Sequence, residues 1–436
     1  MMMTGMRGRL GSAILCVGIA GSAAVRGETP QDELLAHFKE KIRHTLTELP
    51  NYTCLETIQR SERRPRAHAF KPLDTVLLEV STTGNKELLA WPGARRFEDA
   101  DVTAFVSGGL FGSGIFAQHA RNIFLYDTTV IKYKGAEEIA GRAVTRYNFS
   151  VPQALSRLQI QTSSGTAVVG TEGSFWIDPT SLQLIRLEVV ADGLPAALGI
   201  AKATTRIDYA PMRVGASDVL LPQGAELLMA LTAGKTMRNV IQFSHCRGYQ
   251  SESAIRFDVS DAAPQASKPA VRELDLPAGL TVPIELQTAI DSASAHVGDL
   301  LRGSVLKDVK LKGNTIIPKG AAVAGRIRGL DPASPSPSLA LTIELEDVTW
   351  EGAHAEFYGD LVKVSAAEGP LTDVAFPSIG LTPEAMAPAG PRDKSVIAPR
   401  IPGTGVLYMI GQRFRLPKGL RMSWLTLDPN GRQRGK

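Results

Sequence analysis

The chain has 436 residues, of which 44% are hydrophobic, 21% charged and 6% aromatic. This apolar fraction supports packed cores and excludes a wholly disordered chain, and the length favours two or three domains. No repeat of about 20–50 residues is visible, which argues against a solenoid or a propeller.

The first 27 residues have the pattern of a secretory signal peptide. Arg7 and Arg9 precede an apolar run from Leu10 to Val25, which is short for a membrane anchor of about 20 residues. Cys16 follows Leu15 rather than a small residue, so a lipid anchor is not favoured. The sequence therefore predicts a periplasmic or secreted protein that has no integral membrane span after cleavage.

Residues 28–262 predict one mainly β domain that begins with a helix. Thr29 and Pro30 open a helical segment that ends at Leu49-Pro50. From Tyr52 the apolar period changes to two, which predicts an antiparallel, meander-like sheet. The strands expected in this sheet lie at 52–58, 70–80, 86–91, 124–132, 143–151, 174–177, 184–190, 204–210, 226–231 and 237–245.

The segment from Asp101 to Asn122 interrupts this pattern with glycines and apolar side chains. Such side chains either plug the concave face of the sheet or form a lid over a ligand. The candidate ligand-binding residues are Leu110, Phe111, Ile115 and Phe116.

Residues 263–275 predict a linker, and residues 276–430 predict a second domain of short strands between glycine turns. This pattern is typical of a small β-barrel or sandwich. We expect loops at 331–338 and, because it is rich in proline, at 366–403. The fold class expected for the whole chain is mainly β, with a curved antiparallel half-barrel followed by the small barrel.

No pattern in the chain indicates catalysis. A nucleophile elbow is missing, and the seven histidines have no metal-ligand spacing. The run Ala233-Gly234-Lys235-Thr236 is interpreted as a hairpin turn rather than a phosphate loop. We therefore expect no catalytic residue, no metal and no cofactor, and we expect that the protein is not an enzyme.

Cys54 and Cys246 are the two cysteines outside the signal segment, and they are about 190 residues apart. Export exposes them to an oxidising environment, which favours a structural disulfide. Two free thiols remain the alternative, whereas a redox site would need closer spacing in the sequence.

The densest positive segment runs from Arg60 to His68. It is either a solvated hairpin tip or a contact for anionic envelope lipid or cell-wall phosphate. Nucleic acid is not an expected partner, because only Phe70 supplies an aromatic ring nearby. Loss of Arg7, Arg9 and Arg26 with the signal would lower the formal net charge from +4 to about +1, so the overall charge predicts no acidic partner.

Residues up to about 260 resemble the periplasmic lipoprotein carriers of the LolA-like half-barrel group. The resemblance rests on the opening helix, on Tyr52–Arg60, and on Gly173–Pro179 followed by Leu184–Leu187. It implies a curved sheet whose concave apolar face holds acyl chains, with Leu110, Phe111, Ile115 and Phe116 as the lid.

The second half resembles the TrbI-like β-barrel of conjugation and type IV secretion proteins. The matching runs are Val282–Ile290, Gly303–Val309 and Ile316–Gly320. In that family the barrel builds an outer-membrane ring. The combination of both halves looks like exported proteins of soil bacteria.

These observations predict a non-catalytic cell-envelope protein that binds a lipid, an acylated ligand or another apolar molecule in the half-barrel. The alternative is a structural or assembly component of a secretion-like envelope complex, without a small ligand and with an envelope protein as partner.

Overall fold

The computed structural model describes residues 29–83, 86–94, 97, 105, 116–162, 165–214, 217–248, 272–333, 338–365, 402–410 and 413–428. The predicted signal peptide and most of the two predicted connecting segments lie outside these residues. Within the described part of the chain, no helix is long and apolar enough to cross a membrane.

Two α-helices are present in the described residues, α1 (Pro30–Thr47) and α2 (Phe116–Phe124). A capping box begins α1, because the Asp32 amide donates to the Thr29 hydroxyl at 3.3 Å and the Thr29 amide donates to the Asp32 carboxylate at 3.2 Å. The Thr29 hydrogen bonds also lower the pKa of Asp32.

Ten strands of the described residues form one antiparallel sheet, in the order β3-β2-β1-β12-β11-β10-β9-β8-β5-β4. The bounds are β1 (Tyr52–Arg63), β2 (Lys71–Thr83), β3 (Lys86–Ala90), β4 (Val130–Ile139), β5 (Arg142–Val151), β8 (Gly170–Ile177), β9 (Leu184–Asp192), β10 (Ile200–Val214), β11 (Ser217–Leu231) and β12 (Thr236–Gly248). A small hairpin, β6 (Gln159–Thr162) with β7 (Gly165–Val168), and the 3-10 turns Gln153–Leu155 and Ala196–Leu198 complete this half.

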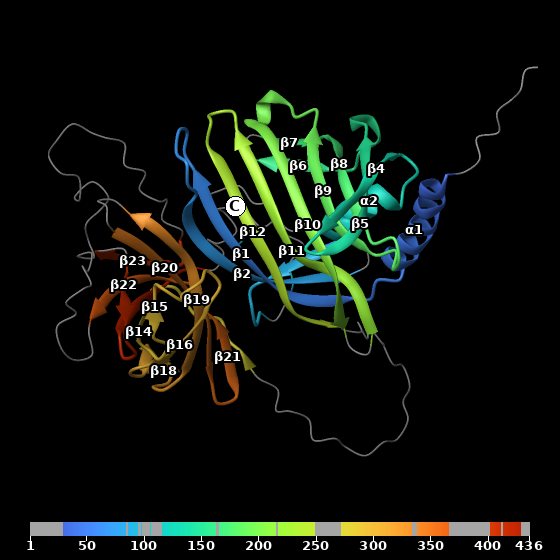
Figure 1. Cartoon of the computed structure of the whole chain (residues 1–436). Helices are drawn as coiled ribbons and strands as arrows, with labels where there is room; N and C mark the ends of the chain where they lie inside the picture. Colours follow the sequence, from blue (N-terminus) through green and yellow to red (C-terminus); the bar gives the residue numbers. More distant parts are fainter. Residues whose placement is uncertain are drawn as a thin grey trace, which may run out of the picture.

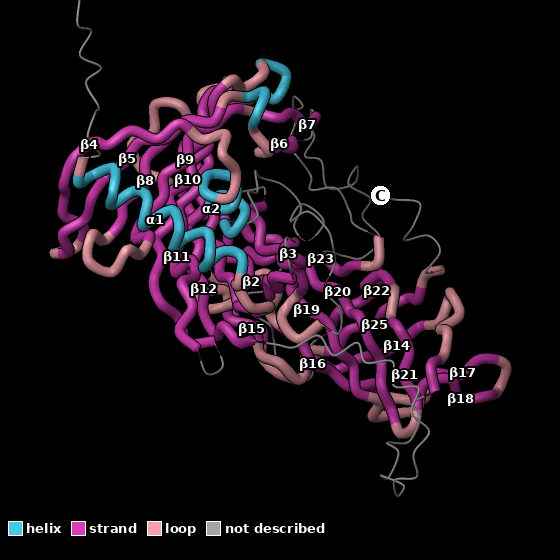
Figure 2. The backbone as a smooth tube through the Cα atoms, turned by 90° about the vertical axis from the view of Figure 1, so that its right-hand side faces the viewer, coloured by secondary structure: helices cyan, strands magenta, loops and turns pink. Residues whose placement is uncertain are grey.

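The sheet curls into a half-barrel around the two helices (Figures 1 and 2). Alternate residues of β1 turn inward, as the period of two predicted, and Ile58 is fully buried. The expected half-barrel is therefore confirmed.

The predicted disulfide is also present, between Cys54 of β1 and Cys246 of β12. Strands β1 and β12 are hydrogen-bonded neighbours in the sheet. The bond therefore joins the first and last strands of this half of the chain.

A second sheet contains nine strands of the described residues, and β23 pairs with β20. Its strands are β13 (Arg272–Glu273), β14 (Thr281–Leu286), β16 (Leu300–Val305), β19 (Ala322–Ala333), β20 (Ser338–Trp350), β21 (Ala353–Glu356), β22 (Gly359–Ser365), β23 (Thr404–Ile410) and β25 (Arg421–Thr426). Two short pairs accompany it, β15 (Ile290–Asp291) with β24 (Arg415–Leu416), and β17 (Val309–Leu311) with β18 (Asn314–Ile317). The Gly403 amide donates to Asp360 at 2.9 Å, which brings the ends of β22 and β23 together and nearly closes a barrel around Trp424.

Three local expectations differ from the structure. Phe124, expected to begin a strand, ends α2, and the strand begins at Val130. The loop expected at 331–338 is shorter, because β19 extends to Ala333, which pairs with Ser338. Arg272, inside the predicted linker, pairs with Ala353; the domain boundaries themselves stay a prediction.

The barrel contacts the half-barrel through Trp91. The guanidinium carbons of Arg326 and Arg328 lie 5.4 Å and 4.8 Å from the centre of the Trp91 ring. Arg326 also donates to both oxygens of Glu346, at 2.5 Å and 2.8 Å. The two halves of the chain are therefore packed against each other.

Candidate functional site

Aromatic side chains fill one end of the concave face. Phe38 of α1 stacks on Phe175 of β8, with ring centres 5.5 Å apart, and Phe124 of α2 meets both rings edge-on. Tyr147 also stacks on Phe175, and its hydroxyl donates to the Gln31 carbonyl at 2.8 Å. This end of the half-barrel is packed by the protein's own side chains.

Elsewhere on the concave face the cavities are small. One of about 10 Å³ lies under α2 between His119 and Val189, and another of about 10 Å³ lies between Tyr52 and Leu221. Each has room for about one water molecule. Neither of these two cavities has room for an acyl chain.

A larger hollow opens where α1 meets the ends of the strands. This α1 groove has a volume of about 480 Å³ and lies between the C-terminal half of α1, the β8–β9 turn and the β10–β11 hairpin. Its apolar lining consists of Ile42, Leu49, Pro50, Leu182, Pro211, Val219 and Leu220. Lys41, His44, Thr45, Glu48, Gln183 and Asp218 supply its polar lining. The volume lies within the usual range of small-ligand sites.

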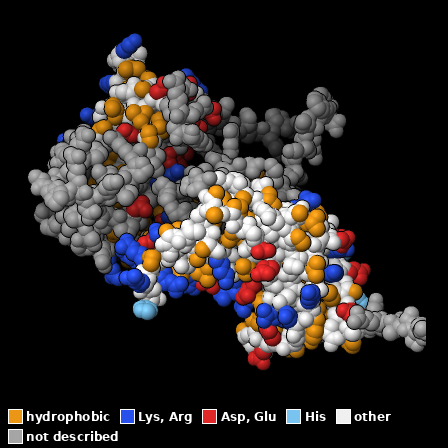
Figure 3. Space-filling view, turned by 90° about the horizontal axis from the view of Figure 1, so that it is seen from above, with side chains coloured by type: hydrophobic (Ala, Val, Ile, Leu, Met, Phe, Trp, Pro, Cys, Tyr) orange, Lys and Arg blue, Asp and Glu red, His pale blue; other side chains and the backbone are white. Residues whose placement is uncertain are grey.

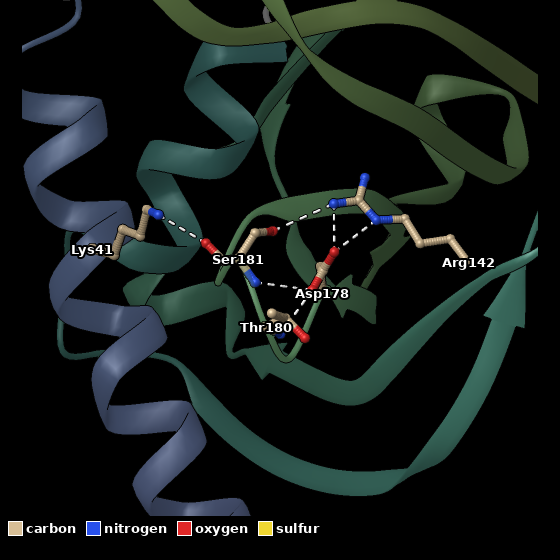
Figure 4. A network of polar contacts seen from close by, with 5 residues as sticks. All are labelled: Lys41, Arg142, Asp178, Thr180 and Ser181. Carbon is tan, nitrogen blue, oxygen red and sulfur yellow. Dashed lines mark hydrogen bonds and ion pairs between the residues drawn. The ribbon is translucent and has the colours of Figure 1, made fainter.

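The β8–β9 turn that forms one wall is held by the Asp178 carboxylate (Figure 4). Asp178 accepts hydrogen bonds from the amides of Thr180 at 2.7 Å and Ser181 at 3.0 Å, and from Nε of Arg142 at 2.7 Å. Although burial acts in the opposite direction, these hydrogen bonds lower the pKa of Asp178 to about 2. The turn therefore keeps its charged anchor over the whole physiological pH range.

Lys41 connects this turn to α1, because its ammonium group donates to the Ser181 carbonyl at 2.8 Å (Figure 4). On another side of α1, Nε of Arg43 donates to the Phe124 carbonyl at 3.1 Å, and Arg43 also pairs with Asp127. Helix α1 is thus tied to the β8–β9 turn through Lys41 and to the end of α2 through Arg43.

A buried carboxyl group is the unusual feature of the concave face. Glu56 of β1 is fully buried, and neither of its oxygens has a hydrogen-bond partner among the described residues. Its cross-strand neighbours are Leu78 and Phe243. Burial raises the pKa of Glu56 to about 8, so this side chain is mostly protonated at neutral pH.

The structure describes little of the predicted ligand-binding segment. Leu110, Phe111 and Ile115 lie outside the described residues, and Phe116 begins α2. Phe105, from the same segment, is buried and meets Trp91 edge-on at 5.3 Å between ring centres. The role proposed for these four residues stays a prediction.

No local pattern in the sequence predicts the α1 groove. Its walls come from three segments that are far apart in the chain, and Leu49 and Leu220 each look like an ordinary core residue in the sequence. The Asp178-Pro179 turn is the one local signal in this region, and the sequence predicts it as the turn of a hairpin and not as part of a site. Within the described residues, no group of three or more His, Cys, Asp or Glu side chains could hold a metal ion.

No family model and no curated protein matches the chain. Among solved structures, a LolA superfamily protein from Nitrosomonas europaea is 10% identical, with a TM-score of 0.27; the match covers 49% of this chain and 93% of that chain. A structure described as an outer membrane lipoprotein-sorting protein domain from Vibrio parahaemolyticus is 11% identical, with a TM-score of 0.27, covering 49% and 92%. The lipoprotein LppX from Mycobacterium tuberculosis is 10% identical, with a TM-score of 0.19, covering 49% and 93%.

At such low identities and TM-scores, a functional proposal depends on the geometry of this chain alone. The resemblance of the second half to TrbI-like barrels stays a prediction.

Proposed function

We propose that the protein is a non-catalytic, exported envelope protein that binds an acyl chain or a similar apolar ligand in the α1 groove. The observation that carries the proposal is the groove itself, an open hollow of about 480 Å³ with apolar side chains from three parts of the fold. Binding an acyl chain there would remove both the chain and these side chains from water.

The polar lining of the groove contains one ammonium group, that of Lys41, together with the carboxylates of Glu48 and Asp218. An acyl chain can lie on the apolar lining while a carboxylate or phosphate at its end meets Lys41. Because Lys41 is the one lysine or arginine in the lining, the groove favours a ligand with a single anionic group at its end, such as a fatty acid.

A titration with a fluorescent long-chain fatty acid tests the proposal. Leu220→Trp would fill the groove with a larger side chain, and we expect it to weaken binding at least tenfold. The matched control is Val168→Trp on β7, which adds the same side chain at an exposed position outside the groove. Equal affinities for Leu220→Trp and the unchanged protein would refute binding in this groove.

The second candidate is the assembly component, in which both halves serve as contact surfaces. It is favoured by the direct packing of Trp91 against Arg326 and Arg328, which makes one continuous surface from the two halves. A stable protein partner on crosslinking, together with no fatty-acid binding by the unchanged protein, would favour this candidate.

A further inference from the structure

The two hairpin tips at the end of the sheet opposite the α1 groove lie against each other. They are the β1–β2 tip, residues 64–70 between the two strands, and the β11–β12 turn, residues 232–235. A Cβ atom added at Gly234 in the β11–β12 turn would lie 3.1 Å from Cγ of Pro65 in the β1–β2 tip. This contact gathers the basic side chains of both tips into one surface, the basic ridge. Its members are Arg63, Arg64, Arg66, Lys71, Lys235 and Arg238.

Acidic partners of the ridge lie beneath the cations. The Glu62 side chain is 12% exposed, whereas its partners Arg64 and Lys235 are 77% and 43% exposed. The Glu226 side chain is 15% exposed, whereas its partners Arg206 and Arg238 are 43% and 38% exposed. Each carboxylate therefore forms ion pairs with two cations that are more exposed than it is, and positive charge remains at the surface.

Two of the guanidinium groups lie against the same aromatic ring. The guanidinium carbon of Arg63 lies 4.9 Å from the centre of the Phe70 ring, and that of Arg238 lies 5.5 Å from it. These two groups come from different hairpins. Figure 3 looks onto this end of the molecule, and Lys and Arg side chains gather along one margin of it.

Arg60, which belongs to the basic segment in the sequence, is not part of this surface. Its side chain is 3% exposed and paired with Asp74, which is equally buried. The basic segment predicted from the sequence therefore includes Arg60, which is buried, and lacks Lys235 and Arg238, which come from the other hairpin.

We propose that the basic ridge docks the protein on an anionic phospholipid surface, through the phosphates of several lipid headgroups. Arginine suits this contact because its planar group can donate two hydrogen bonds to one phosphate. A membrane presents many phosphates in one plane, which matches outward-facing cations on two adjacent hairpins. Single-stranded nucleic acid would instead need aromatic rings free to stack on bases, and Phe70 is already occupied by Arg63 and Arg238.

The proposal is independent of ligand binding in the α1 groove. Strand β11 runs from Ser217, beside the groove, to Leu231, beside the ridge, so the two sites lie at opposite ends of the sheet. A protein docked by the ridge would keep its groove away from that membrane and open to a second partner.

Vesicle co-sedimentation of the full chain tests the docking. We expect binding to vesicles of phosphatidylcholine with about 30% phosphatidylglycerol, and at least fivefold weaker binding when salt is raised from about 50 to 300 mM. Pure phosphatidylcholine vesicles should bind at least tenfold more weakly. Equal binding to both vesicle types would overturn the proposal.

Charge reversal locates the contact. The triple variant Arg64→Glu, Arg66→Glu and Lys71→Glu changes exposed residues of the ridge and should lower vesicle binding at least tenfold. The matched control reverses three exposed lysines elsewhere, Lys132, Lys134 and Lys310, and should retain most of the binding. An equal loss in both variants would overturn the ridge in favour of overall charge.

Two further measurements keep the outcome decisive. Circular dichroism checks that the triple variant is folded. If it is not, Arg66→Gln alone should still weaken vesicle binding about twofold, and unchanged binding would count against the ridge.

Competition by soluble glycerol phosphate at equal phosphate concentration would reassign the ridge to a free phosphate ligand. Tight binding to an oligonucleotide without vesicle binding would reassign it to nucleic acid.

Discussion

Val297 of the barrel pairs with Val76 of β2 in an isolated parallel β-bridge. The Val297 amide donates to the Thr75 carbonyl at 2.8 Å, and its carbonyl accepts from the Leu77 amide at 2.8 Å. Strand β3 covers β2 only from Glu79 onward, so this stretch of β2 would otherwise expose an unpaired edge. Val297 of the barrel therefore covers this part of the open edge of β2.

Gly298 provides a sharp test of that junction. It has a φ of +103°, and an added Cβ would lie 2.6 Å from the Leu77 carbonyl oxygen. We expect Gly298→Ala to lower the free energy of unfolding by about 2–4 kcal/mol and to speed amide exchange at Leu77. The matched control is Gly320→Ala, with a φ of +84° and nothing within 4 Å of its added Cβ; it should cost only about 1 kcal/mol. Equal costs would contradict the close contact.

Glu56 predicts a pH dependence of stability. Its pKa is about 8 in the folded protein against an ordinary value of 4.5. Between these values the unfolded chain releases the proton and the folded protein keeps it, so stability falls as pH rises and levels off above about pH 8.

Denaturant unfolding between pH 6.5 and 8 isolates this effect. Burial lowers the pKa of His119 to about 4, so the contribution of His119 to the free energy of unfolding changes with pH only below pH 6.5. We expect a slope of up to about 1.4 kcal/mol per pH unit. Glu56→Gln should remove the slope, whereas Glu138→Gln, at an exposed position of β4, should leave it unchanged. An unaltered slope in Glu56→Gln would show that another group is responsible.

The disulfide between Cys54 and Cys246 should matter mainly for stability. We expect the double variant Cys54→Ser with Cys246→Ser to lose about 2–5 kcal/mol of unfolding free energy, since the long loop in the unfolded chain is no longer closed. Reductant should lower the melting temperature of the unchanged protein and leave that of the double variant the same. A melting temperature insensitive to reductant in both proteins would argue against a structural role.

Asp178 links turn stability to the groove. Asp178→Ala would remove the acceptor of two backbone amides and of Arg142, and should cost about 1–3 kcal/mol. Because the turn carries Leu182 and Gln183 into the groove lining, fatty-acid affinity should fall severalfold. Thr180→Ala is the matched control, since its backbone amide remains; the account is wrong if both variants behave alike.

Local patterns were sufficient to predict much of the fold. Alternation along Tyr52–Ile58 predicted β1, and the Asp178-Pro179 turn was placed correctly between β8 and β9. They failed at Phe124, where an apolar run looks like a strand but tertiary packing against Phe38 and Phe175 keeps it helical.

The candidate sites were less predictable, because both depend on long-range packing. The α1 groove joins Leu49 to Leu220, and the basic ridge joins Arg63 to Arg238 through Phe70. No local spacing brings these residues together. The burial of Arg60 could likewise not be predicted from the local sequence, because it depends on the ion pair with Asp74 of the next strand.

Native mass spectrometry of the protein purified from its own cell envelope tests the central claim most directly. The account predicts that the unchanged protein and Val168→Trp carry an adduct with the mass of a fatty acid or phospholipid, and that Leu220→Trp lacks it. An unchanged protein without any such adduct, or an adduct retained in Leu220→Trp, would contradict acyl-chain binding in the α1 groove.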